Sequence, residues 1–133
     1  MMACATGLDG GGAVFEVYNG YGCYCGPFTA TTTATPVDPI DRCCFEHDGC
    51  YAKAEQYCPH GKLYVVYYDH VCVKNNSLAV SNSRREPGTP ECRGSQNECG
   101  KKVCECDRVF AECIGKYPVP QQAKSCPGGL RAK

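Results

Sequence analysis

The chain has 133 residues, equal numbers of acidic and basic side chains, and a formal net charge of zero. A neutral chain has no overall field to draw it to nucleic acid, and no apolar run approaches the length of a transmembrane helix. The fourteen cysteines stand out, because leucine, isoleucine, valine and phenylalanine are few and tryptophan is absent. We therefore expect one small domain, residues 1–133, that depends on disulfides more than on a large apolar core.

The cysteine pattern indicates an oxidising compartment. An even number of cysteines, above one tenth of a short chain, is typical of a disulfide scaffold in a secreted protein. The spacings are C-x-C and C-C, whereas zinc sites favour paired C-x-x-C. The start of the chain, MMACATG, has neither the basic nor the apolar region of a signal peptide. We expect an extracellular protein whose signal peptide is absent from this sequence.

The first half of the chain contains one clear helix signal. Residues 1–20 are glycine-rich and weakly patterned, and YGCYCG (21–26) is a tight loop in which glycine permits sharp turns. Residues 27–35, PFTATTTAT, form a polar, exposed stretch. A long helix is predicted to start after Asp38, a natural N-cap followed by a proline, and to end before Pro59.

The second half predicts a hairpin and a second long helix. The segment KLYVVYYDHVCV (62–73) is rich in strand-forming residues, and SLAVS (77–81) could return beside it. Residues 81–91 are expected to be a loop, and a helix should run from about Asn97 to Lys116. The predicted fold is mainly α, small and disulfide-rich, with two long antiparallel helices cross-linked by disulfides and a short two-stranded β-wing.

The cysteines predict how the two long helices meet. Cys43 and Cys50 are seven residues apart and share one face of the first helix, and Cys106 and Cys113 have the same spacing in the second. In antiparallel helices Cys43 can pair with Cys113, and Cys50 with Cys106. Disulfides hold Cα atoms about 5.5–6 Å apart. His47, which lies between Cys43 and Cys50, should therefore project into a tightly held interface.

Acidic and aromatic residues should converge on His47. Asp107 directly follows Cys106 and can accept a hydrogen bond from one imidazole nitrogen, while Tyr51 lies on the same helix face as His47. A carboxylate in that place fixes the tautomer and stabilises the imidazolium, as a general base requires. A lone histidine in a helix is more often structural, so this convergence is what favours catalysis.

A second polar site is predicted beside this pair. Asp48 points about 100° around the helix from His47. Cys44 could bridge to Cys25 and so draw the 21–26 loop over that flank. Loop carbonyls together with one carboxylate make a hard oxygen site that suits Ca²⁺.

The segments YGCYCG, DRCCFEHDGCY and CECDR closely resemble the secreted phospholipase A2 family, and the similarity runs from about Cys4 to Cys126. The resemblance implies calcium-dependent hydrolysis of the sn-2 ester of glycerophospholipids, by a monomer acting at a membrane or micelle surface. His47 would be the general base that activates a water, and Asp107 would orient it. Water would attack directly, without an acyl-enzyme.

The resemblance also implies the remaining site residues. Asp48 would bind Ca²⁺ together with the backbone carbonyls of Tyr24, Gly26 and Phe28. The ion and the Gly26 amide would stabilise the oxyanion. Tyr51 and Tyr68 match the tyrosines that hydrogen-bond the aspartate.

Five further disulfides follow from the resemblance. One of them is the bridge typical of the pancreatic and elapid-venom type, Cys4–Cys72. The others are Cys23–Cys126, Cys25–Cys44, Cys58–Cys99 and Cys92–Cys104.

Two departures from the family pattern are the reason to consider alternative functions. After Gly26 the family usually has one residue and then two glycines, whereas this chain has Pro27, Phe28 and Thr29, and backbone that glycine adopts freely can be strained for other residues. Only three residues precede Cys4, so the N-terminal helix of the family is expected to be truncated. A non-catalytic, otoconin-like calcium-binding or matrix protein is the main alternative, and a venom-type effector is another.

Overall fold

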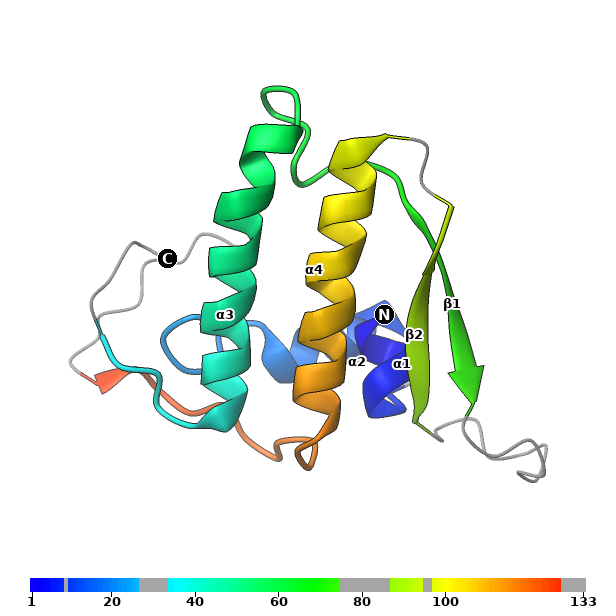
Figure 1. The fold of residues 1–133 in the computed structure, drawn as a ribbon. Coiled ribbons are helices and arrows are strands. Elements are labelled where there is room, and N and C mark those ends of the chain that lie inside the picture. The colour runs from blue at the N-terminus through cyan, green and yellow to red at the C-terminus, as the bar shows by residue number, and fades with distance from the viewer. Residues whose placement is uncertain (9, 27–33, 75–86, 95–96, 128–133) are drawn as a thin grey trace.

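The computed structural model describes residues 1–8, 10–26, 34–74, 87–94 and 97–127. Two long helices, α3 and α4, lie side by side in opposite directions, with a small sheet on the far side of α4 (Figure 1). The predicted fold class is confirmed. The elements of the described part are, in chain order, α1 (Met2–Thr6), α2 (Gly11–Tyr18), α3 (Pro39–Ala54), the 3-10 helix η1 (Glu55–Tyr57), β1 (Asp69–Lys74), β2 (Gly88–Arg93) and α4 (Glu98–Gly115).

Asp38 caps the first long helix, as the sequence predicts, and Asn97, at the predicted start of the second, caps α4. The Asp38 carboxylate accepts a hydrogen bond from the backbone N–H of Asp41 at 2.9 Å, and the Asn97 side chain accepts one from Gly100 at 2.6 Å. Each cap satisfies one N–H that the first helical turn leaves without a partner. The bounds of α4 agree with the prediction to within one residue. The first long helix was predicted to end before Pro59; α3 ends at Ala54 and continues as η1 to Tyr57.

The glycine-rich N-terminal segment is more ordered than its pattern suggested. It forms α1, which packs against α4 and β2, and α2, which packs against α1. Val14 and Tyr18, one turn apart on α2, are both buried in the core. Glycine has poor helix propensity, and α2 opens with two glycines, so packing of the apolar face stabilises this helix.

The two strands differ from the prediction in place. The strand expected over 62–73 begins only at Asp69, and its partner β2 lies largely in the segment 81–91, which was expected to be a loop. A two-stranded sheet accepts Pro90 because each strand has one edge without a neighbour. The returning strand expected at 77–81 lies outside the described residues.

All fourteen cysteines are in disulfides, and all seven predicted pairs are present. The two bridges between α3 and α4 have Cα–Cα distances of 5.8 Å and 5.7 Å, as the antiparallel arrangement requires. The pairs are Cys4–Cys72, Cys23–Cys126, Cys25–Cys44, Cys43–Cys113, Cys50–Cys106, Cys58–Cys99 and Cys92–Cys104.

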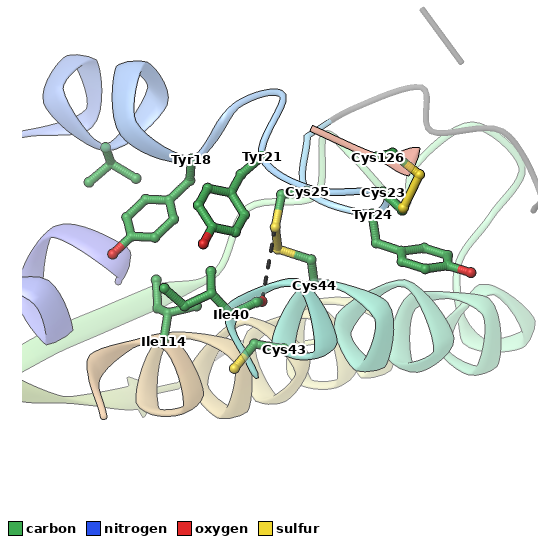
Figure 2. Packing of buried hydrophobic residues seen from close by; sticks show 11 residues of the cluster. Tyr18, Tyr21, Cys23, Tyr24, Cys25, Ile40, Cys43, Cys44, Ile114 and Cys126 are labelled. Atoms are coloured by element: carbon green, nitrogen blue, oxygen red, sulfur yellow. Dashed lines mark hydrogen bonds between the residues drawn. A yellow bond between two sulfur atoms is a disulfide. The ribbon is translucent and has the colours of Figure 1, made fainter. Parts of the chain in front are cut away.

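The main core joins α2, the loop after it, α3 and the end of α4 (Figure 2). Half-cystines and tyrosines make up most of this cluster, and only three of its members are aliphatic. Cross-links therefore fill volume that leucine and phenylalanine fill in larger domains. The buried members are Val14, Tyr18, Tyr21, Cys23, Tyr24, Cys25, Ile40, Cys43, Cys44, Ile114 and Cys126.

The disulfides should contribute to stability less unequally than their sequence separations suggest. Cys23–Cys126 spans 103 residues and Cys92–Cys104 spans 12, but Cys25–Cys44 and Cys43–Cys113 join the same two regions in the unfolded chain. The loop that Cys23–Cys126 closes is therefore short, and replacing either pair by alanine should cost about 3 kcal/mol. Denaturant unfolding followed by far-ultraviolet circular dichroism measures both. A clearly larger cost for the long-range pair would contradict this account.

Candidate active site

The centre of the site is an imidazole–carboxylate pair that bridges the two long helices. His47 lies on α3 and Asp107 on α4, and the distance from His47 Nε2 to Asp107 Oδ1 is 2.7 Å. The side chains are 19% and 21% exposed, so the pair is sheltered yet open on one side. The contact expected from the cysteine spacing is therefore present.

Two tyrosines complete the set of hydrogen bonds to Asp107. Tyr51, one turn after His47 on α3, donates from its hydroxyl to the same Oδ1 at 2.7 Å. Tyr68, just before β1, donates to Oδ2. One carboxylate thus accepts hydrogen bonds from three side chains that come from two different parts of the chain.

The hydrogen bonds decide the charge of the carboxylate. Burial by itself raises the pKa of Asp107, but the hydrogen bonds from His47, Tyr68 and Tyr51 outweigh it and hold this pKa below its ordinary value. Burial, together with the nearby Asp107, raises the pKa of Tyr51 and of Tyr68. The tyrosines therefore stay protonated donors, and Asp107 stays an anion at neutral pH.

This arrangement fixes the chemistry of the neutral imidazole. An ionised carboxylate only accepts hydrogen bonds, so the nitrogen that faces Asp107, Nε2, carries the proton. The other nitrogen, Nδ1, is then left with a lone pair. His47 is thereby prepared to take a proton at Nδ1 while Asp107 faces the positive charge that develops.

A ring that the sequence analysis did not single out contacts His47. Phe110, on α4, stacks on the imidazole with ring centroids 4.5 Å apart and an interplanar angle of 30°. Tyr51 contacts the same imidazole at 4.3 Å with a tilt of 48°. The available signal was spacing, since Phe110 is three residues after Asp107 and so lies on the same helix face.

The loop at 21–26 depends on a second missed residue. Asp41, in the first turn of α3, is fully buried. Its carboxylate accepts backbone hydrogen bonds from Cys23 at 2.9 Å, Tyr24 at 2.8 Å and Val37 at 2.9 Å. A Cβ on Gly22 would lie 2.3 Å from the Asp41 carboxyl carbon, so only glycine lets the loop approach this closely.

Further contacts hold the loop to the segment before α3. The Tyr24 hydroxyl donates to the Ala34 carbonyl at 2.5 Å. The Tyr21 hydroxyl donates to the Asp38 carboxylate, which also forms an ion pair with Lys124 at 3.1 Å. The loop is thus fixed by side chains at both of its ends.

Of the four predicted calcium ligands, the structure describes Tyr24, Gly26 and Asp48. The Cys25–Cys44 disulfide, with a Cα–Cα distance of 5.0 Å, joins the loop to α3. Asp48 is one turn after Cys44 and is exposed, and Gly26 adopts a φ of 108°. Phe28 lies outside the described residues. Among those described, no three His, Cys, Asp or Glu side chains gather as a metal site.

The comparisons with known proteins agree with this geometry. The family model described as Phospholipase A2 matches residues 1–124. The chain belongs to the phospholipase A2 family. The resemblance found in the sequence is confirmed, and the seven disulfides and two long helices are those of a phospholipase A2 fold.

Relatives in the phospholipase A2 family come from several animals. "Basic phospholipase A2" of Micrurus corallinus is 38% identical over 101 residues, 76% of this chain and 59% of the relative. "Phospholipase A2" of Calliactis polypus is 38% identical over 75% of this chain and 52% of the relative. "Basic phospholipase A2 beta-bungarotoxin A2 chain" of Bungarus caeruleus is 40% identical, with coverages of 74% and 55%. The chain thus spans little more than half the length of these relatives.

Family membership leaves the roles of the individual site residues as predictions. The structure brings His47, Tyr51, Tyr68 and Asp107 together. In the part of this phospholipase A2 family member that the structure describes, none of the helices has the length and apolar character needed to cross a membrane.

The Asp41 carboxylate should stabilise the protein strongly. Asp41→Asn replaces one acceptor oxygen by an NH₂ group, which must face a backbone N–H. Hydrogen bonds to a charged group contribute about 1.5–3 kcal/mol each, so we expect a loss of about 3 kcal/mol in unfolding free energy. Asp69→Asn, at an exposed aspartate of β1, is the matched control and should change little. A similar result for both variants would show that Asp41 does not anchor the loop.

Proposed function

We propose that this chain is a calcium-dependent phospholipase A2 that hydrolyses the sn-2 ester of glycerophospholipids. The observation that carries the proposal is the Asp107 carboxylate, which binds His47 Nε2 and is itself held by Tyr51 and Tyr68. A buried histidine with a purely structural role does not require a neighbour of this kind. A general base does, because its tautomer and its orientation must both be fixed.

His47 would activate water directly. A water that donates to Nδ1 attacks the ester carbonyl carbon, and His47 takes its proton as the new C–O bond forms. The tetrahedral intermediate then expels the glycerol oxygen, which receives the proton from His47. The ester bond is replaced by a free fatty acid and a lysophospholipid. Asp107 remains an anion throughout and stabilises the transient imidazolium.

The residues beside this pair fit a calcium ion. Asp48 and the carbonyls of Tyr24, Gly26 and Phe28 would be the ligands, and such an all-oxygen donor set is what Ca²⁺ prefers. When bound, the ion supplies positive charge for the oxyanion and the phosphate. The backbone N–H of Gly26 would be a second donor to the oxyanion. The attachment of the loop to α3 through Cys25–Cys44 supports this assignment.

We place the protein outside the cell and on phospholipid surfaces. All its cysteines are oxidised in the structure, which fits an extracellular compartment, and the relatives' printed names describe phospholipases A2. The expectations that it works as a monomer and has no nucleic-acid partner stay predictions.

Replacing the general base should abolish hydrolysis. Fatty-acid release from phospholipid–detergent mixed micelles with calcium should fall at least about 100-fold in His47→Gln, because a positioned general base contributes that much or more. His60→Gln, at an exposed histidine after η1, is the matched control and should retain full activity. Equal background release from wild type and His47→Gln would instead support the non-catalytic matrix protein.

Reversing the charge of the proposed metal ligand should remove calcium binding. Asp48→Lys places an ammonium where the carboxylate would face Ca²⁺, so isothermal titration should show no saturable calcium binding. Glu46→Lys, on an exposed acidic residue of the same helix, makes the same charge change and should leave the titration intact. An unchanged calcium isotherm in Asp48→Lys would refute the ligand assignment.

A further inference from the structure

The stacking of Phe110 on His47 is not required by the proton-transfer chemistry described above. The two rings are stacked, with centroids 4.5 Å apart and an interplanar angle of 30°. Phe110 is partly buried and packs against the main core. It is therefore held from behind while its face meets the imidazole.

The hydrogen bond to Asp107 does not by itself fix the plane of the imidazole. It fixes the position of Nε2 at one edge of the ring, but the ring plane can still tilt about the line that joins His47 to the carboxylate. Tilting moves Nδ1, the nitrogen that would receive the proton, away from a fixed point. A flat group against the ring face opposes this tilt, and near-parallel aromatic contacts are favourable in themselves.

The placement of Phe110 makes it a rigid support. On α4 it lies between Cys106 and Cys113, as His47 lies on α3 between Cys50 and Cys43, and the two disulfides join these pairs. The two rings therefore face each other in the stretch where the helices are cross-linked on both sides. Neither helix can slide to open the stack without straining a covalent bond.

We propose that Phe110 is a positioning residue, which sets the plane of the His47 imidazole so that Nδ1 faces the reacting water. Its catalytic consequence rests on the proposed function, whereas the orientation of the ring does not. Small misplacements of a catalytic group cost large factors in rate. The residue should therefore act on turnover more than on substrate binding.

The test compares two changes at this position. Phe110→Leu removes the flat ring, and Phe110→Tyr keeps it. We expect Phe110→Leu to lower kcat about 10-fold or more with KM changed less than about twofold, and Phe110→Tyr to stay near wild type. Phe15→Leu, the same change at a residue 59% exposed on α2, is the matched control and should have wild-type activity.

A second readout does not depend on activity. Nuclear Overhauser contacts between the ring protons of His47 and Tyr51, whose ring centroids lie 4.3 Å apart, report the orientation of the imidazole. These contacts should be the same in wild type and Phe110→Tyr and should change in Phe110→Leu. The tautomer protonated at Nε2, read from the ¹⁵N chemical shifts of His47, should persist in all three proteins because Asp107 sets it. Phe110→Leu that loses stability but keeps both the ring contacts and kcat would show that Phe110 only packs, and would overturn the proposal.

Two outcomes separate this proposal from the proposed function. If wild type shows no calcium-dependent release while the His47–Tyr51 ring contacts change in Phe110→Leu, the proposed function fails and the positioning of the ring stands. If Phe110→Leu does not fold, Phe110→Met replaces it, and the wild-type protein gives an independent test. Absence of a nuclear Overhauser contact between the Phe110 ring and the His47 ring protons would overturn the proposal whatever the variants do.

Discussion

The separation of α3 from α4 is the constraint on which the candidate site depends. Two disulfides set it, with Cα–Cα distances of 5.8 Å and 5.7 Å, and they lie on either side of the stretch where His47 meets Asp107. Hydrogen bonds weaken steeply when their geometry is lost. A chain with so few large apolar residues could not hold two helices to this tolerance by packing alone, so covalent bonds replace part of the core.

Two carboxylates each hold neighbouring polar groups in place by accepting several hydrogen bonds. Asp107 accepts hydrogen bonds from three side chains, and Asp41 accepts them from three backbone amides. In both cases burial of a negative charge is offset by several donors. Asp107 orients the imidazole, and Asp41 anchors the loop that would hold calcium. Asp41 lies on α3 and Asp107 on α4, so the cross-linked helix pair carries both carboxylates.

The sequence contained enough to predict the two long helices, the disulfides between them and the central pair, and the family resemblance supplied the other disulfides. Asp38 and Asn97 are local cap signals, and the seven-residue cysteine spacing gave the register that brings His47 to Asp107. The burial of Asp41 could not be predicted, because an acidic residue in a first turn fits the local pattern whether it faces water or a loop. Phe110 was missed because apolar helical spacing is the same for a core residue and for a ring that supports a histidine. β2 was missed because strand propensity does not register a partner supplied by tertiary structure.

The oxidation state of the cysteines determines how the disulfide pairing can be lost. Every cysteine of the chain lies in the described part of the structure, and none is a free thiol. Exchange between disulfides begins with attack by a thiolate, and this molecule carries no attacking group of its own. Its pairing can therefore be scrambled only by a reagent or a partner that brings a thiol. In an oxidising medium the connectivity would persist through transient unfolding, and the chain would return to the same native pairing.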